Sequence, residues 1–167
     1  MKSPNAGLRF AAVAAAFLML AACSSTDENA GANTSPSSSS STIAPGSQED
    51  LVANVGDRVF FDTDRSSLSD EARATLQRQA AWMELYPNLT FTLEGHADER
   101  GTREYNLALG GRRANSAKDY LVSLGVDGGR LNTVSYGKER PVCLESNENC
   151  WAQNRRAVTV VASGAAS

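Results

Sequence analysis

Residues 89–102 read LTFTLEGHADERGT, and the change of pattern within this stretch decides the fold. Apolar and polar residues alternate through its first half, a period of two that predicts a β-strand with one buried face. Two glycines and a cluster of charged residues follow, which predicts a loop. Small and apolar residues then recur at helical spacing from about residue 102 to residue 124, and Gly125 is suited to end that helix. The stretch therefore predicts a strand, a charged loop and a long helix in direct succession.

The sequence on either side predicts further strands and another helix. Residues 58–61 and 131–136 have the composition of strands, and residues 157–162 are almost uniformly apolar, as in a central strand. Ser69 can cap a helix whose apolar residues follow helical spacing and which ends before Pro87. The order β-α-β-α-β-loop-β indicates an α/β fold, an α+β sandwich with the helices packed on one face of a mixed four-stranded sheet.

The beginning of the chain has the composition of an export signal. Lys2 and Arg9 give it a positive start, residues 11–22 are apolar, and Cys23 follows directly. The apolar run is shorter than the roughly 20 residues that a membrane-spanning helix needs. We therefore expect a signal peptide over residues 1–22. Its Leu-Ala-Ala-Cys ending resembles a lipobox, which predicts that lipid is attached to Cys23.

Residues 23–50 are expected to form a flexible tether, and residues 51–167 the globular domain. The tether is rich in Ser, Thr, Ala, Gly and Pro, and such a segment buries too little apolar surface to fold by itself. Two or more acyl chains on Cys23 would hold the protein stably at a membrane. Because Ser24 and not Asp follows the cysteine, we expect the outer membrane, with the domain in the periplasm.

Cysteine usage and net charge narrow the class of protein. An exported chain meets an oxidising compartment, so we expect Cys143 and Cys150 to form a disulfide. The sequence contains a single histidine, His96, and no Cys-x-x-Cys motif, so we expect neither a metal site nor a cofactor. The formal net charge of −3 argues against a nucleic-acid partner, since binding phosphates usually requires an excess of basic residues.

Three segments are expected to meet at one end of the sheet, where α/β proteins often bind ligands. Residues 60–64 leave the first strand, residues 95–102 leave the second, and residues 154–156 precede the last. Arg113 lies within the buried stripe of the second long helix, on the same face as Asn106.

A buried arginine needs an anionic partner or a route to solvent. Two interpretations of Arg113 follow from its position alone. It makes a structural ion pair, with Asp98 or Asp62, or it binds an anionic ligand.

Several separated motifs resemble those of the OmpA-like peptidoglycan-binding domain family. They are Gly95-His96-Ala97-Asp98-Glu99-Arg100-Gly101, Tyr105-Asn106, Leu109-Gly110, Arg113-Ala114, Tyr136-Gly137 and Asn154-Arg155-Arg156. Together with Phe61-Asp62 and the lipobox, the GHADERGT sequence is most similar to the lipid-anchored members of that family. The resemblance covers about residues 59–161, which is nearly the whole predicted domain.

The resemblance implies a ligand, the stem peptide of peptidoglycan, and above all its meso-diaminopimelate. The free end of that residue carries an ammonium and a carboxylate on one carbon. In the family pattern Asp98 faces the ammonium and Arg113 faces the carboxylate, which suits a pure acceptor and a planar two-pronged donor. Further residues expected to orient or extend this site are Asn106, Asp62, Arg155, Asn154 and Thr102.

The resemblance also implies a cellular role. It predicts a protein that tethers the outer membrane to the cell wall, with TolB and the Tol system as partners, and that supports envelope integrity and constriction during division. The overlap of the partner surface with the ligand site leaves open a second interpretation, a pure protein-interaction module.

An enzyme is the remaining alternative. His96, Asp98 and Glu99 together suggest a hydrolase or a metal site, but no nucleophile-elbow motif accompanies them. We therefore predict that the protein is not an enzyme.

Overall fold

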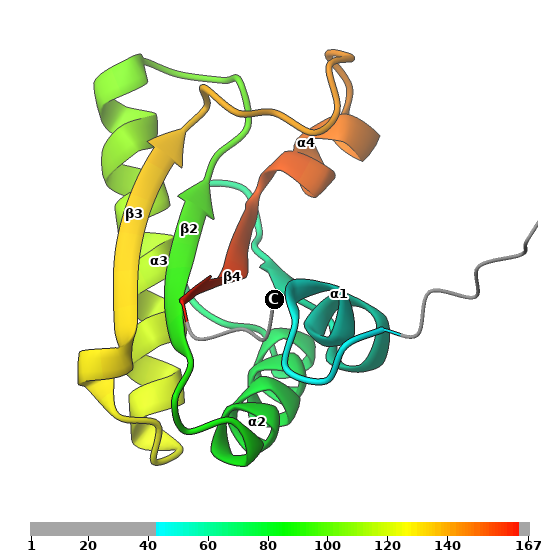
Figure 1. Ribbon diagram of the computed structural model, residues 1–167. Helices are drawn as coiled ribbons and strands as arrows, with labels where there is room; N and C mark the ends of the chain where they lie inside the picture. The colour runs from blue at the N-terminus through cyan, green and yellow to red at the C-terminus, as the bar shows by residue number, and fades with distance from the viewer. Residues whose placement is uncertain (1–42, 164–167) are drawn as a thin grey trace, which may run out of the picture. The chain divides into compact units, whose positions relative to one another are not determined.

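The computed structural model describes residues 43–163 (Figure 1). The predicted signal peptide, the predicted lipid attachment at Cys23 and most of the predicted tether lie outside these residues. Within the described part, no helix combines the length and the apolar character that crossing a bilayer requires.

Within residues 43–163, four strands form one mixed sheet in the order β1-β4-β2-β3. The strands are β1 (Arg58–Phe60), β2 (Thr90–His96), β3 (Leu131–Gly137) and β4 (Arg156–Ser163). Strand β4 is antiparallel to both of its neighbours, β1 and β2, whereas β2 and β3 are parallel. The apolar last strand is therefore central, as its composition predicted.

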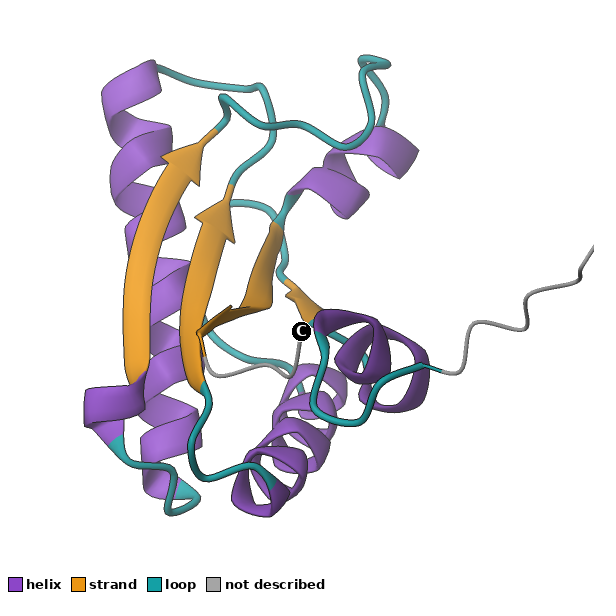
Figure 2. Cartoon of the chain, in the orientation of Figure 1, coloured by secondary structure: helices purple, strands orange, loops and turns teal. Residues whose placement is uncertain are grey.

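Two long helices, α2 (Asp70–Leu85) and α3 (Arg103–Ser123), pack against one face of this sheet. In the view of Figures 1 and 2, α3 runs behind β2 and β3. Ser69 caps α2, and Thr102 caps α3, each by accepting a hydrogen bond from a backbone N–H three residues ahead. The predicted fold class is confirmed.

The contact between α3 and β2 depends on two glycines. A Cβ atom added at Gly95 would lie 1.8 Å from the carbonyl oxygen of Gly110, and one added at Gly110 would lie 2.8 Å from the oxygen of Gly95. No side chain fits between the two backbones, so the helix lies directly on the strand. This contact places the beginning of α3 beside the loop that follows β2.

The folded part begins earlier than the boundary expected at residue 51. A short helix, α1 (Gln48–Asp50), leads into a π-helical turn, η1 (Leu51–Val55). The buried Asp50 carboxylate accepts hydrogen bonds from the backbone N–H of Gly46 at 2.9 Å and from the indole of Trp82 at 3.0 Å. The end of the predicted tether is therefore part of the domain.

The predicted loop before β4 contains a helix, α4 (Glu148–Asn154), and a 3-10 turn, η2 (Gly128–Arg130), precedes β3. Cys143 and Cys150 are joined by a disulfide, with their Cα atoms 5.0 Å apart. The disulfide ties the first turn of α4 to the segment before it.

Candidate ligand-binding site

The three segments that were expected to meet do so through hydrogen bonds. Phe61 and Arg155 connect the first segment to the last, because the Phe61 N–H donates to the Arg155 carbonyl and the Arg155 Nε donates to the Phe61 carbonyl. Arg113 connects the first segment to the second, because its Nη2 donates to the Asp62 carbonyl at 3.1 Å and its Nη1 to the His96 carbonyl at 2.8 Å.

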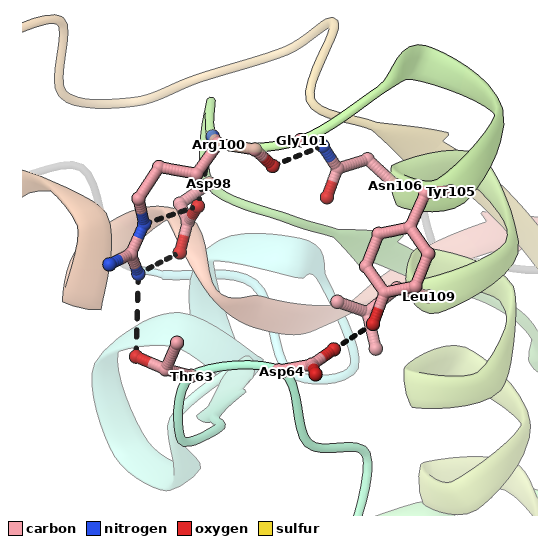
Figure 3. A pocket seen from close by; sticks show the side chains of 8 residues that line it. All are labelled: Thr63, Asp64, Asp98, Arg100, Gly101, Tyr105, Asn106 and Leu109. Atoms are coloured by element: carbon pink, nitrogen blue, oxygen red, sulfur yellow. Dashed lines mark hydrogen bonds and ion pairs between the residues drawn. The ribbon is translucent and has the colours of Figure 1, made fainter.

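A cavity of 260 Å³ lies at this junction (Figure 3). Its lining comes from the loop after β1, the loop after β2 and the first turns of α3: Thr63, Asp64, Asp98, Arg100, Gly101, Tyr105, Asn106 and Leu109. Two predicted ligand residues, Asp98 and Asn106, therefore lie at the same cavity.

Asp98 supplies a buried negative charge to the cavity. Its side chain is only 9% exposed. Its carboxylate accepts hydrogen bonds from the backbone N–H and guanidinium of Arg100, and from the guanidinium of Arg155. Burial is the largest influence and acts to raise the pKa of Asp98, but the hydrogen bonds from Arg100 and Arg155 together hold the pKa below its ordinary value. The carboxylate is therefore charged at neutral pH.

Arg113 is fully buried and does not itself line the cavity. Besides the two carbonyl contacts above, its Nε donates to the Arg65 carbonyl at 2.8 Å. Within residues 43–163 it forms no ion pair, so the structure does not show the first of the two interpretations, an ion pair with Asp98 or Asp62. Its partners are three backbone carbonyls, two from the loop after β1 and one from the last residue of β2.

The charge of Arg113 nevertheless interacts with the acidic residues that line the cavity. Burial lowers the pKa of Arg113 to about 10, and the nearby Asp98 carboxylate opposes this shift. The guanidinium is therefore still charged at neutral pH. A guanidinium has five N–H donors, and the three hydrogen bonds to carbonyls leave one N–H on each Nη without a partner among the described residues.

Arg155 is a second buried cation next to Asp98. Its side chain is 7% exposed, and it contacts Asp98 and also Glu148 at 2.6 Å. Asp62 and Arg155 line a separate cavity of 480 Å³ next to Phe60 and Phe61. Asp62 thus lines this second cavity and not the 260 Å³ cavity, and its carbonyl accepts the hydrogen bond from Arg113.

Asn154 and Thr102, two of the predicted ligand residues, form hydrogen bonds with nearby backbone groups. The Asn154 side chain accepts hydrogen bonds from the backbone N–H groups of Val142 and Cys143 and donates to the Cys143 carbonyl. Thr102 is the N-cap of α3. Neither residue lines the 260 Å³ cavity.

Several cavity residues were not predicted from the sequence. Arg100 donates to the Thr63 hydroxyl at 3.3 Å, and the Tyr105 hydroxyl donates to the Asp64 carboxylate (Figure 3). These two contacts connect opposite walls of the cavity. Arg100 lies inside the GHADERG motif and could have been found there. Asp64 belongs to the segment 60–64 that was expected at the site, but its role there was not predicted, since its left-handed backbone (φ 59°) depends on how the loop turns.

The structure is an α/β domain with a cavity at the end of its sheet, and charged side chains of both signs line that cavity: the buried Asp98 and the exposed Asp64 and Arg100. Such a cavity is suited to binding a charged ligand. A model of the OmpA family matches residues 60–156. The chain belongs to the OmpA family. The predicted family resemblance is confirmed.

Similar proteins are named peptidoglycan-associated lipoprotein. The one from Rhizobium meliloti is 64% identical over 117 residues, which cover 70% of this chain and 66% of that protein. The one from Mesorhizobium japonicum is 53% identical over 152 residues, 91% of this chain and 90% of that protein. The crystal structure of the peptidoglycan-associated lipoprotein from Burkholderia pseudomallei is similar with a TM-score of 0.61 at 45% identity, covering 62% of this chain and 88% of that one.

More distant structures share the fold alone. The C-terminal domain of Helicobacter pylori MotB has a TM-score of 0.61 at 18% identity, covering 65% of this chain and 85% of that one.

The family relationship also confirms the prediction that the protein is not an enzyme.

Proposed function

We propose that this protein binds peptidoglycan non-covalently, by holding the zwitterionic end of meso-diaminopimelate in the 260 Å³ cavity. The observation that carries the proposal is the buried, charged Asp98 carboxylate at this cavity, with the cations Arg155 and Arg113 close to it. The names of the relatives associate those proteins with peptidoglycan, which supports peptidoglycan as the ligand of this protein.

Each charge of the ligand has a counterpart at the site. The ammonium is placed at Asp98, with the exposed Asp64 carboxylate on the facing wall. The carboxylate is attracted by the Arg113 guanidinium, which does not line the cavity and acts through its charge and through the loop 62–65 to which it donates hydrogen bonds. Asn106 lines the cavity and orients the ligand, whereas Thr102 and Asn154 support the surrounding backbone.

Co-sedimentation with purified sacculi tests the proposal. Asp98→Asn keeps the shape of the side chain and removes its charge, so we expect at least about 10-fold weaker binding. Asp119→Asn is the matched control, because it makes the same charge change at an exposed position on α3 away from the cavity. Binding of the folded Asp98→Asn variant at the wild-type level would contradict the assignment.

The proposal extends to the cell envelope. We propose that residues 1–22 are removed, that Cys23 carries the lipid, and that residues 24 to about 45 connect it to the domain. The protein would then anchor the outer membrane to the wall, within the Tol–Pal system and with TolB as a partner, and would assist outer-membrane constriction during division. The word lipoprotein in the names of the relatives supports this arrangement.

Mass spectrometry of the native N-terminus tests the anchor, with an acylated Cys23 as the expected first residue. Cross-linking in cells tests the partner, with a TolB adduct as the expected product. An unmodified N-terminus upstream of Cys23 would contradict the anchor, and the absence of that adduct would contradict the partner.

A further inference from the structure

The Asp98 carboxylate has no acceptor site to spare. A carboxylate offers about four lone-pair sites, and donors occupy all of them. Oδ1 accepts from the backbone N–H and the Nε of Arg100, both at 3.1 Å. Oδ2 accepts from Arg100 Nη2 at 2.7 Å and from Arg155 Nη1 at 3.4 Å. An ammonium that binds Asp98 must therefore displace a donor.

The Arg100 side chain is the donor that can leave. It is 38% exposed, so water can solvate its guanidinium when it moves. Arg155 cannot move in this way, because it is buried and its Nε also donates to the Phe61 carbonyl. Arg100 also donates to Thr63 on the facing wall, so its departure opens the cavity (Figure 3).

Helix α4 carries two side chains that can bind the displaced guanidinium. The Arg100 Cζ already lies 4.2 Å from the centroid of the Trp151 ring, within the range of a cation–π contact. Arg100 Nη1 lies 3.9 Å from a carboxylate oxygen of Glu148. The Trp151 ring is held in place because its Nε1 donates to the Glu99 carboxylate at 2.9 Å. A short movement of the Arg100 side chain therefore strengthens contacts that already exist.

The backbone around Arg100 does not need to move with the side chain. Lys138 donates to the carbonyls of Glu99 and Gly101 at 3.0 and 2.7 Å. Asn106 donates to the Arg100 carbonyl at 2.7 Å. These contacts hold the loop on both sides of Arg100, so the side chain can exchange partners on a fixed backbone.

We propose that Arg100 is a specificity-determining residue that occupies Asp98 and yields it to the ammonium of the ligand, moving onto Trp151 and Glu148. This inference rests on the proposed function. Because the ligand must compete with a guanidinium, an isolated amine gains little binding free energy at Asp98. A group that carries both an ammonium and a carboxylate gains binding free energy from the charges of both Asp98 and Arg113, and so it displaces Arg100. The resident arginine thus selects zwitterionic ligands over simple cations.

Titration of the purified protein with a meso-diaminopimelate tripeptide tests the proposal. Removing the competitor in Arg100→Ala should tighten binding about 2- to 10-fold. Arg103→Ala is the matched control, since it removes an equal charge from an exposed side chain that does not line the cavity, and its affinity should stay at the wild-type value. Thermal unfolding checks that each variant is folded.

A double-mutant cycle separates the exchange of partners from a structural effect. Trp151→Leu should weaken binding in the wild-type background, because the displaced guanidinium loses its place, and should have no effect in the Arg100→Ala background. Equal or weaker binding by folded Arg100→Ala, with a wild type that binds, would overturn this inference and leave the proposed function standing. A wild type that does not bind the tripeptide would overturn both.

Discussion

Asp98 and Arg155 form an ion pair in which both side chains are less than one-tenth exposed, with Arg155 Nη1 lying 3.4 Å from Asp98 Oδ2. Arg155 also donates to the Phe61 carbonyl and to Glu148. One guanidinium thus connects the loop after β2 to the end of β1 and to α4. The same contacts that shape the cavity also stabilise the fold around it.

Replacing Arg155 should therefore reduce stability as well as binding. Arg155→Met keeps most of the volume but leaves Asp98 with one cation fewer in a buried place, and breaking a buried pair in this way costs about 3–5 kcal/mol. Chemical denaturation of the purified domain measures the effect. Arg112→Met, on the exposed side of α3, should change the free energy of unfolding by less than about 0.5 kcal/mol. Equal stability of the two variants would contradict the structural role of Arg155.

Gly95 should tolerate no side chain at all. A Cβ atom there would overlap the Gly110 carbonyl of α3, so Gly95→Ala should cost more than about 3 kcal/mol or prevent folding. Gly111 is the matched control, because a Cβ atom there meets only Ser135, at 3.9 Å. Gly111→Ala should stabilise the domain by up to about 1 kcal/mol, since alanine favours helix over glycine. Thermal unfolding compares the two, and a stable Gly95→Ala domain would contradict the close approach of α3 to β2.

His96 should make the domain sensitive to mild acid. Burial lowers its pKa to about 4, and nearby arginines, Arg156 first, act in the same direction. Both ring nitrogens lack a hydrogen-bond partner within the described residues. An unfolded histidine takes up a proton near pH 6.5, so between about pH 6.5 and 4 the unfolded state binds more protons, and stability falls by up to about 3 kcal/mol as the pH falls.

Proton NMR measures this pKa directly, because His96 is the only histidine in the chain. The imidazole signals should titrate with a midpoint near 4 and stay unchanged between about pH 5.5 and 8. A midpoint close to 6.5 would contradict the buried, neutral state. The variant His96→Asn should lose the extra acid sensitivity of unfolding in the same pH range.

Asp50 should fix the beginning of the domain. Its carboxylate accepts hydrogen bonds from Gly46, Asn54 and Trp82, and the backbone bond from Gly46 contributes most to lowering its pKa. Asp50→Ala leaves buried donors without partners and should cost about 2–3 kcal/mol in chemical denaturation. The neighbouring Glu49 is exposed, so Glu49→Ala should have almost no effect. Equal effects would indicate that residues before 51 do not belong to the fold.

Local patterns predicted most of the fold. The alternation in residues 89–93, the cap Ser69 and the helical spacing from about residue 102 depend only on neighbouring residues, and the structure has β2, α2 and α3 where these signals lie. The two segments that were missed have polar sequences. The residues that form α1 have the composition of the tether, and α4 is a short helix within a loop closed by a disulfide. Whether these segments form helices depends on tertiary contacts, which no local sequence pattern reveals.

The site was predictable in part for the same reason. Spacing placed Asn106 and Arg113 on the buried face of one helix, and both are buried. The partners of Arg113 were not predictable, because they are backbone carbonyls, including that of Arg65, which any residue type supplies. The competing role of Arg100 depends on the position of Trp151, which lies 51 positions further along the chain and reaches the loop only through α4.

The most direct test of the account compares two stem peptides that differ at one carboxylate. Calorimetric titration of the purified domain would use a tripeptide ending in meso-diaminopimelate and the same tripeptide ending in lysine, which keeps the amine and lacks the adjacent carboxylate. If a zwitterion is held between Asp98 and the charge of Arg113, the diaminopimelate peptide should bind at least about 10-fold more tightly. Equal affinity for the two peptides would contradict the account.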